Sequence, residues 1–217
     1  MKIKLFALSA LFAAAATASI GAHAQDVYLG AGLPGLATIG YAAPMGKNWG
    51  LRADYAGGLN ASLDGNRDGV NFTGNLKYSA FGAYADWFPF DGGFRLVGGV
   101  RVTDGKVDLN ATGSGNAVIN GVNVNMAGEY YNVTVKMPST MPYVGIGYGH
   151  QRSDPGLGFY FDVGVMIGTP EVSSATSLVT SGKVTQADVN AQNQKLRDGV
   201  SGVGFIPSVS LGVVYRF

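Results

Sequence analysis

Apolar and polar residues alternate along the end of the chain, from Gly204 to Phe217. A period of two predicts a β-strand whose two faces meet different surroundings. One face is small and polar apart from Arg216, whereas the other ends in aromatic side chains. This division is typical of a strand with lipid outside and a narrow polar interior inside. The apolar row comprises Phe205, Pro207, Val209, Leu211, Val213, Tyr215 and Phe217.

Turn residues divide the rest of the chain into similar alternating segments. We therefore expect an all-β fold, an eight-stranded antiparallel up-and-down transmembrane β-barrel. Pro138 and Pro142 interrupt the sixth segment, so the extent of its upper half stays open. The expected strands cover residues 26–33, 36–43, 49–62, 71–88, 94–109, 132–148, 157–168 and 204–217.

The connections between these strands are unequal, which is the usual asymmetry of membrane barrels. Short turns near residues 44–48, 89–93 and 151–156 are expected on the periplasmic side, with both chain ends. The expected outer loops cover residues 64–69, 110–130 and 170–203, besides a tight turn at residue 34. An aromatic girdle is expected at the periplasmic rim, made of Tyr41, Trp49, Trp87, Phe94, Tyr148, Phe159, Tyr215 and Phe217.

Two of the outer loops carry signals of local structure. Asn120-Gly121 predicts a small hairpin, because both residue types tolerate the positive φ of a tight hairpin turn. Thr185 and Asp188 resemble a capping box, and Gly199 resembles a helix C-cap. We therefore expect a short polar helix over Gln186–Asp198.

The first residues have the pattern of a secretory signal. Lys2 and Lys4 precede an apolar, Ala-rich run, and Ala22-His23-Ala24 matches a peptidase site before Gln25. We expect a signal peptide over residues 1–24 and the barrel over residues 25–217. Removing Lys2 and Lys4 takes the 15 basic residues to 13, against 14 acidic ones, so the charge does not suggest a nucleic-acid partner.

A soluble sandwich or lipocalin-like barrel is the alternative to a membrane barrel. It would leave the apolar rows exposed to water, which soluble proteins avoid. The alternating strands, the signal and the terminal Tyr-Arg-Phe resemble the small bacterial outer-membrane barrels related to the OmpA transmembrane domain, OmpX and OmpW. The resemblance implies that the barrel assembly machinery reads Tyr215 and Phe217.

We expect a structural or surface-interaction role, carried by the outer loops of a Gram-negative outer-membrane protein. The inward rows carry charges and tyrosines, and an eight-stranded interior is just wide enough for side chains to fill. We expect these charges to pair and plug the lumen, because unpaired buried charges are costly. The alternative is a porin-like narrow channel for small solutes. The network comprises Arg52, Asp54, Asp86, Arg95, Arg101, Asp162 and Arg216.

We do not expect an enzyme or a bound cofactor. A hydrolytic triad needs a histidine beside its nucleophile, and His150 is the only histidine after residue 24. It falls near a periplasmic turn, away from the long loops. Asp64, Asn66 and Asp68 match the start of a calcium-binding loop, but its twelfth position lacks the bidentate glutamate. This makes them only a weak metal candidate.

Three lysines share the outward parity of neighbouring expected strands: Lys77, Lys106 and Lys136. Each lies about eleven to twelve residues above the periplasmic rim, which corresponds to roughly 28 Å of height on tilted strands. This is just above the apolar band. We hypothesise that the lysines form a basic cluster that meets lipopolysaccharide phosphates. The alternative is three unrelated lysines.

Overall fold

The computed structural model describes residues 25–67, 69–90, 92–150, 155–201 and 204–217. The expected signal peptide, residues 1–24, lies outside the described residues, as does Asp68 of the weak metal candidate. The described chain is mainly antiparallel β-structure with one helix. This confirms the expected all-β class.

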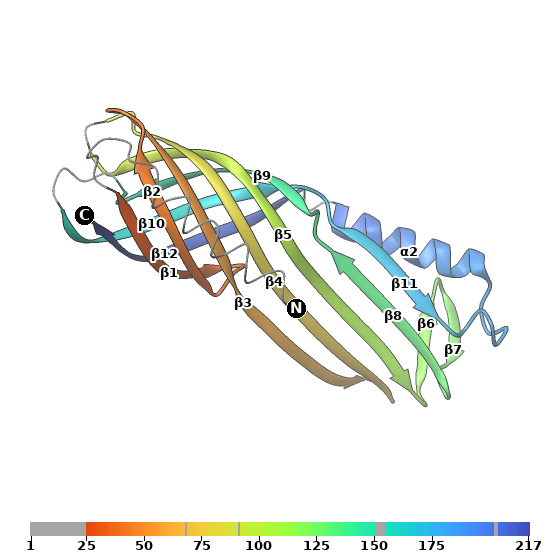
Figure 1. Ribbon diagram of the computed structural model, residues 1–217. Helices are drawn as coiled ribbons and strands as arrows, with labels where there is room; N and C mark the ends of the chain where they lie inside the picture. Colours follow the sequence, from red (N-terminus) through yellow and green to blue (C-terminus); the bar gives the residue numbers. More distant parts are fainter. Residues whose placement is uncertain (1–24, 68, 91, 151–154, 202–203) are drawn as a thin grey trace, which may run out of the picture.

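Within the described residues, eight strands pair in succession and close on themselves (Figure 1). Every pairing is antiparallel, and the last strand pairs with the first. We call this closed ring the barrel. In chain order its strands are β1 (Asp26–Leu33), β2 (Ala37–Pro44), β3 (Trp49–Arg67), β4 (Val70–Trp87), β5 (Phe94–Gly113), β9 (Thr140–Tyr148), β10 (Gly156–Ile167) and β12 (Phe205–Arg216).

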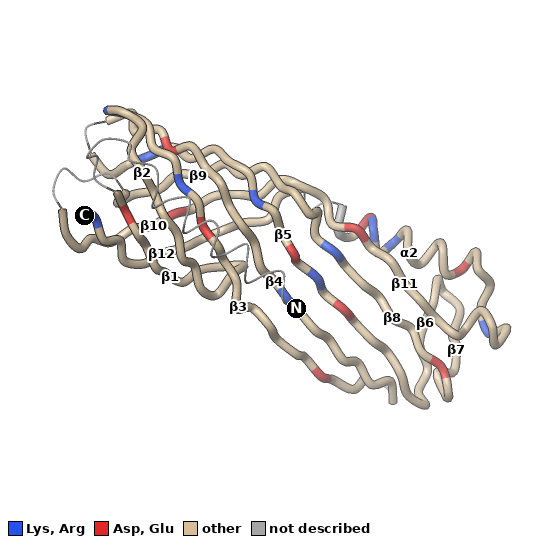
Figure 2. The backbone as a smooth tube through the Cα atoms, in the orientation of Figure 1, with Lys and Arg blue, Asp and Glu red and all other residues tan. Residues whose placement is uncertain are grey.

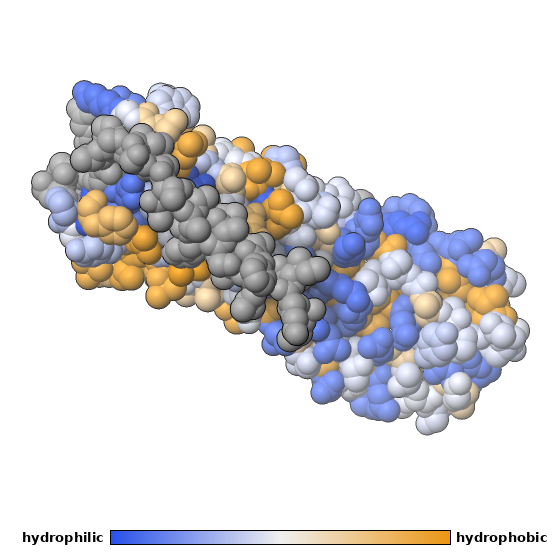
Figure 3. Space-filling model, viewed as in Figure 1, coloured by the Kyte–Doolittle hydropathy of each residue, from blue (hydrophilic) through white to orange (hydrophobic). Residues whose placement is uncertain are grey.

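The predicted alternation holds in the barrel. On β12, Leu211 is 59% exposed and Tyr215 52%, whereas Ser208 and Arg216 are buried inside. At the rim, Trp49 stands opposite Trp87 in the register, and their rings stack 6.2 Å apart. Apolar residues gather over the barrel half of the molecule and polar residues over the other half (Figure 3). The barrel therefore has an apolar outer surface and a polar interior.

Beyond the barrel, β3, β4 and β5 continue into an open sheet, which we call the extension (Figure 1). β8 (Glu129–Lys136) pairs with the end of β5, and β11 (Glu171–Thr176) pairs with β8. The hairpin of β6 (Asn116–Ile119) and β7 (Val122–Asn125) and the helix α2 (Gln186–Ser201) complete it. A second apolar core joins these parts, with Met126 and Leu178 fully buried.

The extension departs from the sequence prediction in three places. The expected sixth strand is broken between β8 and β9 at Pro138, although Met137 N–H still donates to Gly105 O (2.9 Å). The expected loop 64–69 is largely wrong, because the β3–β4 hairpin stays paired to Arg67 and Val70. The strand β11, in the expected loop 170–203, was not predicted.

The hairpin signal and the signal for the start of the helix are both confirmed. Asn120 and Gly121 form the β6–β7 turn with positive φ angles of 50° and 85°. Asp188 N–H donates to Thr185 Oγ1 (3.2 Å), and Thr185 N–H donates to Asp188 Oδ2 (3.0 Å), which is a reciprocal capping box. The predicted C-cap is wrong, because α2 continues through Gly199.

α2 packs on the extension through Val189, which belongs to its apolar core, and the sequence of the helix is mainly polar. Of the helical residues that the structure describes, none belongs to a stretch long and apolar enough to cross a membrane as a helix.

Candidate functional site

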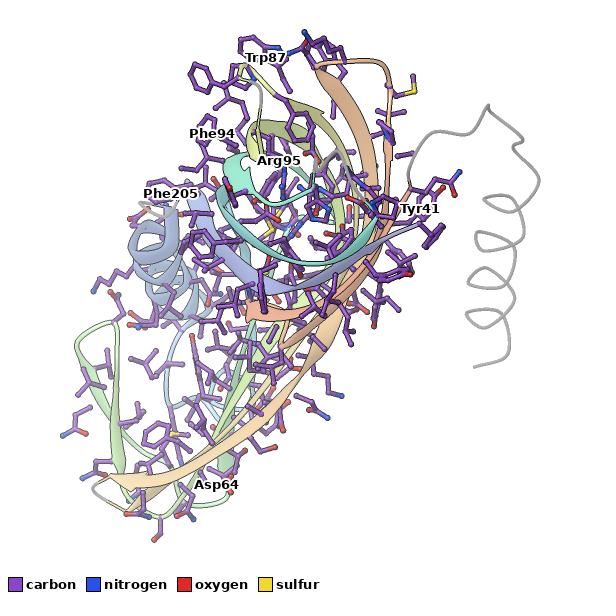
Figure 4. All side chains as sticks on the ribbon, turned by 90° about the vertical axis from the view of Figure 1, so that its left-hand side faces the viewer. Tyr41, Asp64, Trp87, Phe94, Arg95 and Phe205 are labelled. Carbon is purple, nitrogen blue, oxygen red and sulfur yellow. The ribbon has the colours of Figure 1, made fainter. Side chains whose placement is uncertain are left out.

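The candidate site is the charged interior of the barrel. The alternation of each strand points these side chains inward, and all seven residues predicted for the lumen are buried. Figure 4, in which the left-hand side of Figure 1 faces the viewer, shows Arg95 inside the ring and Trp87, Phe94 and Tyr41 toward its outside. Asp26 joins the seven, so the described lumen holds four arginines and four aspartates.

The centre of the network joins four strands. Arg52 Nε lies 3.0 Å from Asp86 Oδ2, and Arg52 Nη1 donates to Asp162 Oδ2 at 3.4 Å. Arg95 Nη2 donates to the other oxygen of Asp162 at 2.6 Å, and Arg95 Nε lies 3.5 Å from Asp86. Arg95 is wholly buried. Each arginine thus contacts the same two carboxylates, which ties β3, β4, β5 and β10 together across the lumen.

Tyrosines fill the space around this centre. Tyr28 and Tyr84 both donate their hydroxyls to Asp54, at 3.2 and 3.0 Å. The Arg52 guanidinium lies 4.4 Å from the centroid of the Tyr84 ring, within cation–π range. Asp54 therefore accepts hydrogen bonds from two neutral hydroxyl groups, whereas Arg52 Nη1 lies 3.8 Å from its Oδ2.

The end of the lumen next to the two ends of the barrel chain contains an ion pair, of which sequence reasoning missed one partner, Asp26. Arg216 contacts both oxygens of Asp26, at 2.7 and 3.0 Å, and also donates to His150 O. His150 is buried, with its ring 4.6 Å from that of Tyr28. Asp26 has the inward parity of Tyr28, so the alternation of the first strand carried the signal for it.

Arg101 lies between the charged network and a cluster of apolar side chains in the lumen. Arg101 donates to Tyr84 Oη (2.6 Å) and to Ser208 Oγ (3.2 Å). Beside it, the buried side chains of Met141 and Met166 lie in one cluster with Tyr78, Tyr143 and Val97, and Met141 is directly opposite Arg101 in the register. The described lumen is therefore lined both by ion pairs and by a cluster of sulfur, aromatic and aliphatic groups.

Glycines provide the room that the large side chains need. A Cβ on Gly147 would stand 2.2 Å from Asp162 Oδ1 and 2.8 Å from the Arg95 guanidinium carbon. A Cβ on Gly82 would stand 2.0 Å from the Tyr84 hydroxyl. These contacts are far shorter than van der Waals packing permits, so glycine at both positions is part of the network.

The lysines and the described residues of the weak metal candidate, which the sequence predicts for the outer surface, lie on the strands of the extension, away from the lumen. Lys77, Lys106 and Lys136 are exposed and stand in one row across β4, β5 and β8. Asp64 and Asn66 lie in paired strand, where Asn66 donates to Asn71 (2.6 Å), whereas a calcium loop curls around its ion.

The residues implied as an assembly signal lie on the outer face of the barrel. Tyr215 and Phe217 are 52% and 55% exposed, and their ring centroids lie 6.1 Å apart. Both stand at the rim, where Val27 on β1 faces Tyr215 in the register.

Comparisons with known proteins show what the fold resembles. No protein-family model matches the chain, and no curated protein matches it. The crystal structure of CarO2 from Acinetobacter baumannii is similar, with a TM-score of 0.62 and 19% identity over 90% of this chain and 99% of that one. CarO from the same organism gives a TM-score of 0.58 and 18% identity, over 88% and 97% of the two chains. At this identity the likeness establishes a shared fold across nearly the whole described chain.

Proposed function

We propose that this chain is an integral outer-membrane β-barrel protein of a Gram-negative bacterium, with a plugged lumen and a structural or surface-interaction role. The observation that supports this proposal is the distribution of side chains in the barrel, which has apolar residues on its outer surface and paired charges in its interior. Phe159 is 77% exposed and Leu211 59%, whereas Arg95 is wholly buried. In water such an outer surface would aggregate, whereas in lipid it is the expected one.

The lumen favours a plug over an open pore. Its four arginines and four aspartates balance, and Arg52 and Arg95 share the carboxylates of Asp86 and Asp162. Removing one partner of such a buried pair costs about 3–5 kcal/mol, so the network resists opening. The apolar cluster around Met141 and Met166 adds a second obstacle to ions.

The extension is the part that we assign to surface interaction. It has its own apolar core, its own helix and a capped, hydrogen-bonded frame. Lys183 Nζ, for example, lies 3.1 Å from Glu129 Oε1, and Ser177 donates to the same carboxylate. Loops that served only to connect strands would not need such a core.

A narrow channel is the second candidate function. In the described part of the lumen, Arg95 Nη1 and His150 Nε2 are buried and have no hydrogen-bonding partner in the protein. Buried polar atoms of this kind are commonly satisfied by water. A chain of water through the lumen would carry a small ion current, which distinguishes this candidate from the plug.

Location and orientation can be tested on intact cells. We expect the protein to fractionate with the outer membrane, and its unboiled and boiled forms to migrate differently on gels. Added protease should cut within residues 177–184 of the extension while the barrel strands stay protected. A soluble fraction, or cleavage within β10 or β12 on intact cells, contradicts the proposal.

A further inference from the structure

Three exposed lysines of the extension stand side by side. Lys77 on β4 is directly opposite Lys106 on β5, and Lys106 is directly opposite Lys136 on β8. All three are exposed. Neighbouring strands lie about 4.8 Å apart, so the row spans roughly 10 Å. Figure 2 shows basic positions, in blue, on β5 and β8. We call them the lysine row.

The row is electrostatically unfavourable by itself. Like charges directly opposite each other in a sheet destabilise it. Lys106 is compensated by Asp108, whose carboxylate lies 2.8 Å from its ammonium group. No carboxylate of the described residues lies within ion-pair distance of Lys77 or Lys136; Glu171 stands opposite Lys136 in the register without forming such a pair. Two ammonium groups are thus available to an external anion.

The height of the row determines which anion can reach it. Val102 is the last exposed apolar residue on the outer face of β5 and is 55% exposed. Lys106 follows four residues later, a rise of roughly 10 Å on a strand tilted by about 40°. The polar headgroup region of a bilayer is about 5–7 Å thick on each side. Flexible lysine side chains directed toward the membrane therefore reach its charged groups.

We propose that the lysine row binds phosphate groups of lipopolysaccharide at the outer surface of the membrane. This inference rests on the proposed function, which places the extension outside the cell. Lipopolysaccharide is the phosphate-bearing lipid of that surface, and a phosphate between Lys77 and Lys106, or between Lys106 and Lys136, relieves the repulsion within the row. Asp104 and Asp108 flank the row on the same face and limit its affinity, since they repel the same phosphates.

The test compares the wild type with a K77S/K106S/K136S variant, both refolded in neutral detergent and titrated with purified lipopolysaccharide. Each unpaired lysine near an anionic surface strengthens binding about fivefold, and Lys77 and Lys136 are the two unpaired ones, so we expect the apparent Kd to rise on the order of 30-fold. A K77R/K106R/K136R variant keeps the charge and should bind within about threefold of the wild type. Lipopolysaccharide stripped of phosphate should bind all three proteins equally weakly.

Asp108 provides a second, opposite test. D108N frees Lys106 from its internal partner and should strengthen binding by a few fold. Unchanged affinity in the serine variant, or equal losses in the serine and arginine variants, overturns the proposal. If the serine variant loses its heat-modifiable migration, the single variants K77S and K136S replace it, and each should lose about fivefold. Failure of the protein to fractionate with the outer membrane would instead refute the proposed function.

Discussion

At the residue scale, the interior of the barrel depends on pairing large charged side chains with glycines. Arg95 and Asp162 occupy space above Gly147, and Tyr84 occupies space above Gly82. The charges satisfy one another only if the guanidinium and carboxylate groups keep distances near 3 Å. A methyl group at either glycine would therefore displace side chains of the network. The resulting loss of stability distinguishes a closely packed network from a loosely filled lumen.

Replacing Gly147 with alanine tests this dependence. The added Cβ collides with the Arg95–Asp162 pair, and overpacking of this kind costs about 1–3 kcal/mol. We expect G147A to lower the free energy of unfolding by that amount in urea titrations followed by gel migration. G98A is the matched control, because a Cβ on Gly98 meets no atom within 4 Å. Equal effects of the two substitutions would show that the network tolerates displacement.

At the scale of elements, alternation predicted the barrel strands because each has one apolar and one polar face. The same parity would have added Asp26 to the lumen. The extension was less predictable. Glu171–Thr176 is short and polar, and it becomes β11 only because β8 offers a free edge. Gly199 was expected to end α2, yet a single glycine costs only about 1 kcal/mol in a helix and the helix continues.

The capping box of α2 gives a pH-dependent prediction. Hydrogen bonds from Thr185 lower the pKa of Asp188 below its ordinary value of 3.8. A carboxyl whose pKa is lower when folded stabilises the fold above its unfolded pKa and loses that contribution as the pH falls through the folded value. We expect amide protection in the first turns of α2 to fall in acid below pH 3.8. In D188N this dependence should vanish, and a persistent one would assign it to another group.

The core of the extension should unfold separately from the barrel. Leu178 is fully buried in that core, and Leu→Ala substitutions in such sites cost about 2–5 kcal/mol. We expect protease to degrade the extension faster in L178A than in the wild type, while the barrel keeps its heat-modifiable migration. V118A alters a side chain that is 64% exposed and should leave both properties unchanged. Loss of the barrel in L178A would mean that the two parts fold as one unit.

At the scale of the whole molecule, the chain combines a closed barrel with a structured extension on one end (Figure 1). The barrel interior contains ion pairs and an apolar cluster, and the outer surface changes from mainly apolar to mainly polar where the extension begins (Figure 3). On these grounds we propose that the barrel anchors the protein and that the extension interacts at the surface. The central claim of this assignment is that the lumen does not conduct.

Bilayer conductance of the refolded protein tests that claim most directly. A variant carrying R52A and D86A together keeps the net charge, removes two side chains from the central layer, and serves as the positive control for an opened lumen. Our account predicts no steady ion current through the wild type and a measurable current through the double variant. A steady, reproducible single-channel current through the wild type would contradict the account and favour the narrow channel.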